Sequence, residues 1–156
     1  MPTPTYDLLG TVTVGPSTSI VTFGSIDQSY NDLVFVIDNV GALQQGVIRF
    51  NSDSGSNYEY LMMKGDGSTA TGDSGGASGI FTMPTTEVAL SRHHIFDYSA
   101  TNKNKSVLGT GAGANGVLAQ VAKWKSNNAI TTVTYTIGSM TVGATISLYG
   151  ITKTVV

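Results

Sequence analysis

The chain has 156 residues and a mass of 16.2 kDa, which suits one domain with its own hydrophobic core. Only 12% of the residues are charged and 40% are hydrophobic, which excludes disorder caused by excess charge. The lack of Cys excludes disulfides, a thiolate nucleophile and Cys-based zinc sites, and a net charge of −2 without a basic cluster argues against a nucleic-acid partner.

Gly, Ser and Thr make up more than a third of the chain, a composition typical of an all-β protein with many turns. The strands predicted in the first half cover residues 11–14, 19–23, 32–38, 46–50 and 58–63. The near-continuous β-branched run at 32–38 predicts a central strand covered on both faces. Residues 46–50 and 58–63 flank a polar segment and predict a hairpin, and the Gly/Ser/Thr-rich residues 64–79 predict a flexible surface loop.

The strands predicted in the second half cover residues 80–83, 87–90, 92–98, 105–111, 117–125, 130–137 and 145–153. Apolar residues alternate with hydroxyls in 131–137, which predicts a strand with one face in the core. Residues 117–125 also fit a helix, because Val117, Val121 and Trp124 share a helical spacing. Alternation in the same segment fits a strand, and the surrounding strands favour that alternative.

About ten strands at short spacing, with no long helix, predict an antiparallel β-sandwich of jelly-roll type. We expect an N-terminal arm at residues 1–6, rich in proline, followed by a single domain at 7–156. The N-terminus lacks the pattern of a signal peptide, and no apolar run is long enough to span a bilayer. We therefore expect a soluble protein without a membrane partner.

Two motifs invite an enzymatic or nucleotide-binding interpretation. Residues 72–76 read Gly-Asp-Ser-Gly-Gly, the segment around the nucleophile of chymotrypsin-like proteases, but both histidines follow Ser74 in the chain. Residues 111–116 match G-x-G-x-x-G, yet no acid follows Asp97 to bind a ribose. We interpret both motifs as glycine-rich turns and expect a protein that is not an enzyme.

Metal and cofactor sites are not expected. Residues 51–57 carry oxygen ligands at alternate positions, as a calcium loop would, but an Asx-rich turn explains them better, and a weak site near Asp53 is the remaining alternative. His93 and His94 are adjacent on a predicted strand, so their rings point to opposite faces and cannot share a metal.

Charge is divided unevenly along the chain. All ten acidic residues lie in residues 1–97, and every charged residue in 98–156 is a lysine. If early and late strands interleave in the fold, these opposite charges lie beside one another within the chain. Alternatively, they form contacts between subunits. Trp124 lies between Lys123 and Lys125, on the face opposite both, and suits a core position, a subunit interface or a ligand platform.

Three segments carry a resemblance to a known family. They are Tyr30-Asn31-Asp32-Leu33-Val34-Phe35, the stretch from Phe50 to Tyr58, and the closing Ile146-Ser147-Leu148-Tyr149-Gly150-Ile151. In this order they resemble small virion proteins of tailed bacteriophages, cyanophages among them. The likeness extends from about residue 6 to 152.

The resemblance implies a β-sandwich in the virion, either as a capsid decoration (cement) protein or as a receptor-binding domain of a tail or tail fibre. The expected partners are the major capsid protein and further copies of the chain, as a homotrimer, or alternatively a host-surface glycan. The candidate contact residues are Tyr6, His93, His94, Lys123, Trp124 and Lys125.

Overall fold

A computed structural model describes residues 5–38, 45–82, 89–114 and 116–152, which form strands and connecting turns without a helix. The strands in these ranges are β1 (Tyr6–Thr13), β2 (Ile20–Phe23), β3 (Asp32–Asp38), β4 (Val47–Phe50), β5 (Tyr58–Gly65), β6 (Ala70–Ala77), β7 (Ile80–Phe81), β8 (Ala89–Ile95), β9 (Lys105–Gly113), β10 (Gly116–Trp124), β11 (Val133–Thr136) and β12 (Thr145–Ile151). The expectation of an all-β fold is confirmed.

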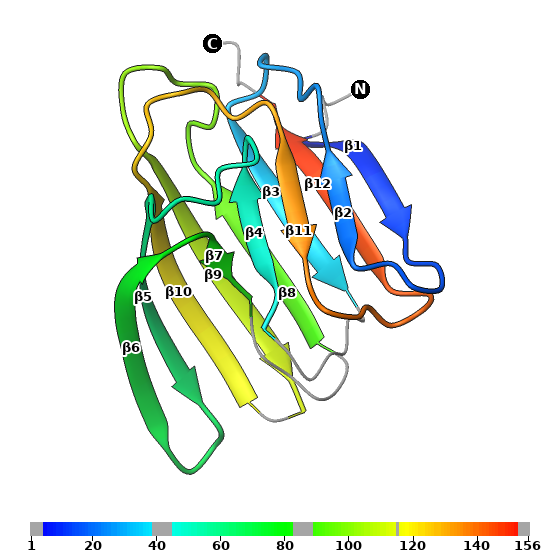
Figure 1. Cartoon of the computed structure of the whole chain (residues 1–156), viewed down its shortest axis with the longest axis vertical. Coiled ribbons are helices and arrows are strands. Elements are labelled where there is room, and N and C mark those ends of the chain that lie inside the picture. The colour runs from blue at the N-terminus through cyan, green and yellow to red at the C-terminus, as the bar shows by residue number, and fades with distance from the viewer. Residues whose placement is uncertain (1–4, 39–44, 83–88, 115, 153–156) are drawn as a thin grey trace.

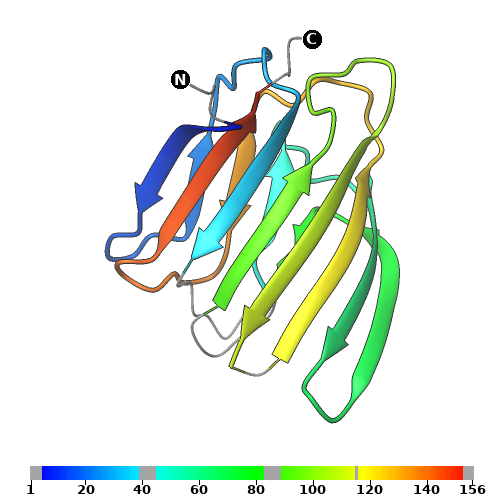
Figure 2. The same cartoon turned by 180° about the vertical axis from the view of Figure 1, so that it is seen from behind.

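The strands form two antiparallel sheets that face each other. One sheet has eight strands in the order β1-β12-β3-β8-β9-β10-β5-β6, and the other has four in the order β2-β11-β4-β7. In Figure 1 the four-stranded sheet lies in front of part of the larger one, and β5, β6 and β10 extend to one side. Figure 2 shows the eight-stranded sheet from behind, with its other face toward the viewer.

The core lies between the layers because each strand alternates its side chains. The buried side chains of β10 point inward and are Leu118, Gln120, Ala122 and Trp124, and the residues that alternate with them are exposed. This alternation confirms a strand rather than a helix at 117–125. β3 lies inside the larger sheet and is buried at most positions on both faces, as its β-branched run predicts.

The predicted hairpin between residues 46–50 and 58–63 is wrong, because β4 and β5 belong to different sheets. The polar segment between them crosses from one layer to the other, and Asn51 and Ser52 turn the chain there with φ angles of 50° and 59°. Asn51 holds the crossing in place: its Nδ2 donates to the carbonyl of Ala129 at 2.8 Å, and its Oδ1 accepts from the amide of Thr131 at 2.9 Å.

The predicted loop at residues 64–79 is also wrong, since residues 70–77 form β6 and pair with β5 along its whole length. Asp66 closes the turn, because its Oδ1 accepts from the amides of Ser68 and Thr69. Backbone hydrogen bonds build this strand, so small side chains suffice. All of β6 except Ala77 is exposed, in keeping with a composition that has little to bury.

Some expectations concern parts of the chain outside the described residues. They are the first four residues of the arm at 1–6, residues 87 and 88 of the strand predicted at 87–90, and the last residue of the strand predicted at 145–153. Residue 83, the last of the predicted strand at 80–83, also lies outside them. In the described part of the chain, no helix is long and apolar enough to cross a membrane.

Candidate interaction surface

The face of the eight-stranded sheet turned away from the four-stranded sheet is called the outer face here. Strand pairing sets its residues in rows that cross the sheet. The middle row runs Leu8, Tyr149, Val34, His94, Leu108, Val121, Leu61 and Ser74. Six of these eight side chains are aliphatic or aromatic, so the row forms an apolar stripe across a surface that no other part of the described chain covers.

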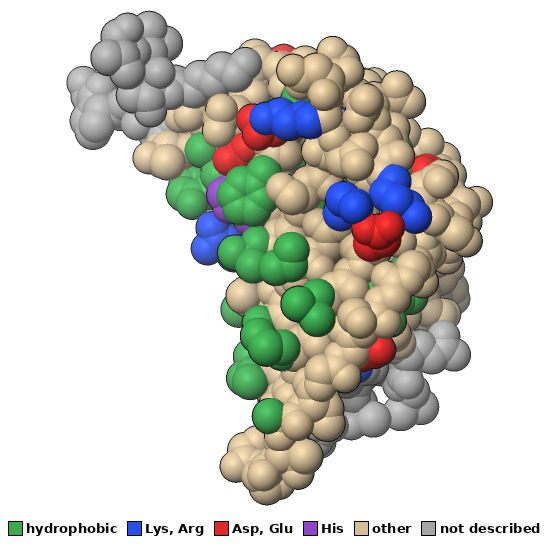
Figure 3. Space-filling view, turned by 90° about the vertical axis from the view of Figure 1, so that its left-hand side faces the viewer, with side chains coloured by type: hydrophobic (Ala, Val, Ile, Leu, Met, Phe, Trp, Pro, Cys, Tyr) green, Lys and Arg blue, Asp and Glu red, His purple; other side chains and the backbone are tan. Residues whose placement is uncertain are grey.

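One half of the outer face, over β9, β10 and β5, carries a patch of exposed apolar side chains, which is called the ridge here. The ridge is defined by Leu61, Met63, Leu108, Val117 and Val121, whose exposed fractions lie between 45% and 62%. Ala119, between Met63 and Thr110 in the neighbouring row, is also exposed. Figure 3 shows hydrophobic side chains gathered in a band on one side of the molecule, beside Lys and acidic groups. Contiguous apolar surface of this kind is typical of an interaction site.

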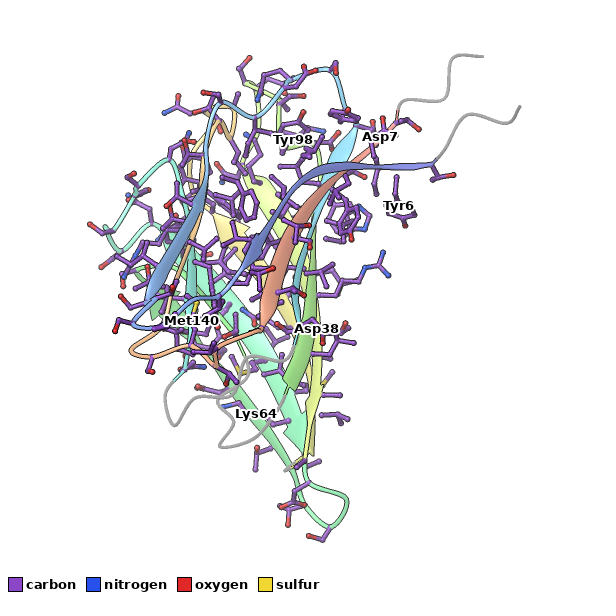
Figure 4. The ribbon with its side chains drawn as sticks, turned by 90° about the vertical axis from the view of Figure 1, so that its right-hand side faces the viewer. Tyr6, Asp7, Asp38, Lys64, Tyr98 and Met140 are labelled. Carbon is purple, nitrogen blue, oxygen red and sulfur yellow. The ribbon has the colours of Figure 1, made fainter. Side chains whose placement is uncertain are left out.

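The other half of the outer face, over β1, β12, β3 and β8, carries a hollow as well as the exposed side chains of Leu8 and Leu90, at 58% and 52%. A shallow hollow of about 330 Å³ is lined by Tyr6, Val34, Val36, Arg92 and Tyr149. Val34 forms its floor and is only 3% exposed. The guanidinium of Arg92 leans toward β1 and donates to the Tyr6 hydroxyl at 3.3 Å. Figure 4 shows Tyr6 on this outer side of the sheet and Tyr98 between the layers.

His94 lies at the middle of the outer face and is held in place on two sides. Its Nε2 lies 3.0 Å from Oδ2 of Asp32, and its ring stacks on Phe96 with the centroids 4.0 Å apart. The other carboxylate oxygen of Asp32 accepts from the backbone amide of Asp97 at 2.7 Å. His94, Arg92, Leu108 and Thr110 line a second hollow of about 190 Å³ beside the first. The candidate contact residues Tyr6 and His94 therefore share one surface.

Lys123 and Lys125 lie at the rim of the outer face and meet an acid from the first part of the chain. Their Nζ atoms lie 2.7 Å and 3.5 Å from the Glu59 carboxylate. The hydrogen bond from Lys123 is the main reason that the pKa of Glu59 falls below its usual value. Lys103 likewise pairs with Asp97 at 2.6 Å. Interleaved strands thus bring the acidic and basic parts of the sequence together.

Trp124 is 2% exposed, so its side chain cannot contact a partner in the folded chain, which corrects its place among the candidate contacts. The indole packs between Phe50 and Tyr58, and its Nε1 donates to Oδ2 of Asp53 at 2.7 Å. The expectation that Trp124 faces away from both lysines is confirmed. This hydrogen bond is the largest cause that lowers the pKa of Asp53.

The Asp53 carboxylate is engaged by donors of the chain itself, which confirms the Asx-turn interpretation of residues 51–57. Besides Trp124, the amide of Gly55 and the side-chain amide of Asn57 donate to it at 2.9 Å and 3.0–3.1 Å. Within the described ranges, no group of three His or acidic residues gathers to hold a metal ion.

His93 points into the sandwich and is 1% exposed, so it cannot serve as a contact residue, which is a second correction. Its opposite orientation to His94 is as predicted for neighbours on a strand. Burial lowers the pKa of His93 to about 4, so the ring is neutral at pH 7. Neither ring nitrogen has a hydrogen-bond partner in the described part of the chain, and the same holds for the side-chain amide of Gln120 nearby.

The two motifs that invited other interpretations lie on strands. Ser74 is on β6, and three strands separate it from the histidines of β8, so residues 72–76 do not place a base beside that serine. Residues 111–116 end β9 and begin β10 rather than opening a helix. Gly116 has a φ of 134°, and a methyl group there would meet the backbone of Gly65, so the turn requires glycine.

Comparison with known proteins adds no relative to this picture: no family model matches the chain, and no curated protein or solved structure matches it either.

Proposed function

We propose that the chain is a non-enzymatic structural protein of a phage virion, a capsid decoration (cement) protein that binds the outer capsid surface. The observation that carries the proposal is the outer face, a broad apolar surface on a chain with a full hydrophobic core elsewhere. Such a surface gains free energy when it is buried against another protein. The outer face is accordingly the assembly surface of the protein.

Strand order supports the proposal at the level of fold. Apart from the two hairpins β5-β6 and β9-β10, the remaining strands have the orders β1-β12-β3-β8 and β2-β11-β4-β7. Successive strands of this set lie in different sheets at every step except from β4 to β7, which pair in the smaller sheet. We infer a jelly roll with two inserted hairpins that widen one sheet. Jelly rolls are frequent in capsid and lectin domains, so this support is an analogy.

A cement protein acts through many weak contacts repeated over a symmetric particle. Each copy joins neighbouring subunits, and contacts that are modest alone sum to a large barrier against disassembly. The outer face supplies apolar area for such contacts. Lys123, Lys125 and Glu59 at its rim supply charges that set orientation more than affinity.

The test is the copy number of the chain per purified particle, measured by quantitative mass spectrometry against the major capsid protein. Hundreds of copies are the expected result, a few tens would support a tail location, and absence would overturn the proposal. Leu61→Glu on the ridge should lower occupancy. Ile20→Glu is the matched control, because Ile20 is equally exposed, at 57% against 56% for Leu61, but belongs to the other sheet.

The alternative function is a receptor-binding part of a tail or tail fibre that recognises a host-surface glycan. The hollow favours it, because Tyr6 and Tyr149 bring aromatic rings beside the donors of Arg92. Tyr149→Ala should abolish glycan binding by the isolated protein if this function holds. Absence of binding by the wild-type protein across a set of host surface glycans would contradict it.

A further inference from the structure

We propose that the assembly surface pairs with a second copy of the same chain across a two-fold axis. The axis runs parallel to the strands, over the line between β8 and β9, so that each ridge fills the hollow of the other copy. The inference names the partner of the surface proposed above and rests on that surface being buried in an assembly. It does not depend on the assembly being a virion.

The position of the ridge and hollow within the sheet is the first argument. β8 and β9 are the fourth and fifth of the eight strands, so the line between them divides the outer face into equal halves. The larger hollow lies in one half and the ridge in the other, and the second hollow lies across the line between them. A two-fold rotation about that line exchanges the halves, and an isologous contact of this kind is self-complementary by construction.

The rows of the sheet show which residues would meet. A two-fold rotation about an axis parallel to the strands places each row of one copy opposite the same row of the other copy. The strand order along the row is reversed, so that β10 of one copy faces β3 of the other. In the middle row, Val121 then faces Val34 of the second copy, Leu61 faces Tyr149, and Leu108 faces His94. Apolar groups of the ridge therefore meet the apolar floor of the hollow. Aligned sheets cross at about 30°, so the match is closest near the axis.

The size of the outer face suits a stable pair. Eight strands about 4.8 Å apart span about 34 Å, and strands of 7–9 residues at about 3.3 Å per residue are about 25 Å long. The face therefore covers on the order of 800 Å², which is the area that each partner contributes to an interface of standard size.

Two basic residues of the outer face suit this pairing, while Asp38 would lie opposite Val117. Lys123 at the rim lies in the row of Asp32, and the rotation places it opposite Asp32 of the second copy. Arg92 lies next to the axis, where it would approach its own counterpart. Its guanidinium leans away from the axis toward Tyr6, which moves the two like charges apart.

A two-fold pair fits this surface better than the homotrimer expected from the sequence. In a ring of three, each copy needs two different contact patches on planes that meet at an angle around the axis. Here the ridge and the hollow lie side by side on one continuous sheet face. A single face of this kind serves one partner.

The test is the molar mass of the full chain in solution, measured by sedimentation equilibrium over a range of concentrations. Wild-type protein should form dimers. Val121→Glu should weaken the dimer at least about 100-fold, because the contact would bury two unpaired carboxylates. Ile20→Glu, a change of equal chemistry and similar exposure on the other sheet, should leave the dimer intact. A wild-type monomer or trimer, or equal effects of the two variants, would overturn the proposal.

Cross-linking through introduced cysteines tests the axis itself, since the chain has none of its own. With sheets about 10 Å apart, the two copies of residue 108 lie about 11 Å from each other and the two copies of residue 61 about 26 Å. A short bis-maleimide should therefore join Leu108→Cys chains and leave Leu61→Cys chains unlinked. The reverse pattern would contradict the axis.

The proposed pair and the proposed virion role fail separately. A dimer that Val121→Glu dissociates, from a protein that is absent from purified particles, would refute the virion role and leave the pair standing. A monomer that coats particles in hundreds of copies would refute the pair and leave the decoration role standing.

Discussion

The two faces of the eight-stranded sheet are built from similar side chains and meet different surroundings. Along β10, Trp124 on the inner face is 2% exposed, and Val121 on the outer face is 55% exposed. The four-stranded sheet covers the inner residue, and no described part of the chain covers the outer one. By contrast, the outer side of β11 carries Thr134 and Thr136, as expected of a strand that faces water. This difference in surroundings is the basis of our proposal that the outer face is buried in an assembly.

The neighbouring histidines of β8 show the same division in polar groups. His94 on the outer face contacts Asp32 and Phe96, and His93 on the inner face lacks a hydrogen-bond partner in the described residues. The outer histidine is thus held by partners, whereas the ring of the inner one is buried without any in the described residues.

The largest expected effect on stability comes from removing the buried indole of Trp124 on the inner face. Trp124→Ala should lower the free energy of unfolding by about 3–5 kcal/mol, because it opens a cavity between Phe50 and Tyr58 and removes the donor to Asp53. Val121→Ala, on the outer face of the same strand, should change it by less than about 0.5 kcal/mol in the monomer. If urea denaturation showed equal losses of unfolding free energy for the two variants, the contrast between the inner and outer faces would be wrong.

The next effect is a dependence on pH. The folded-state pKa of His93 is about 4 against 6.5 for an exposed ring, so only the unfolded chain binds this proton between those values. The neutral ring of His93 therefore makes its full contribution to the free energy of unfolding above pH 6.5. This contribution is lost as pH falls to about 4, a change of about 3 kcal/mol. His93→Phe should remove this dependence from denaturation curves measured across that range, and an unchanged slope would contradict the assignment.

A smaller effect tests how tightly the inner face is packed. A methyl group at Gly109 would lie 2.8 Å from Nδ1 of His93, so Gly109→Ala should cost about 1–3 kcal/mol. Gly75→Ala on β6 is the control, because its methyl would meet only Tyr60, at 3.8 Å or more. We expect that control to stay within about 0.5 kcal/mol of wild type by thermal and urea denaturation.

The sequence predicts the fold class because alternation in segments such as 131–137 depends on local chemistry alone. It does not predict which strands pair, since that depends on contacts between distant residues. The segments at 46–50 and 58–63 look like a hairpin because both alternate around a polar turn, and only the structure assigns them to different sheets. β6 is not predicted for another reason. It pairs with β5 through its backbone, and its small side chains, such as those of residues 72–76, show no apolar alternation.

The candidate surface was accessible to sequence reasoning only in part. The alternation around Trp124 places the lysines correctly, and the same alternation extends to Val117, Ala119 and Val121 on the lysine side. Apolar residues at both the inward and the outward positions of one strand are the sequence signal that points to an apolar outer face. The rows that join Val121 to Leu61 and Leu108 follow from strand order, which the sequence leaves open.

The most direct measurement of whether the outer face becomes covered uses two adjacent methionines. Met62 is 1% exposed on the inner face and Met63 is 62% exposed on the ridge, so limited peroxide oxidation followed by peptide mass spectrometry reports both sides of β5 at once. In dilute protein Met63 should oxidise readily and Met62 should resist. In concentrated or particle-bound protein Met63 should become as protected as Met62. Oxidation of Met63 at the same rate in every state would contradict an assembly surface on this face.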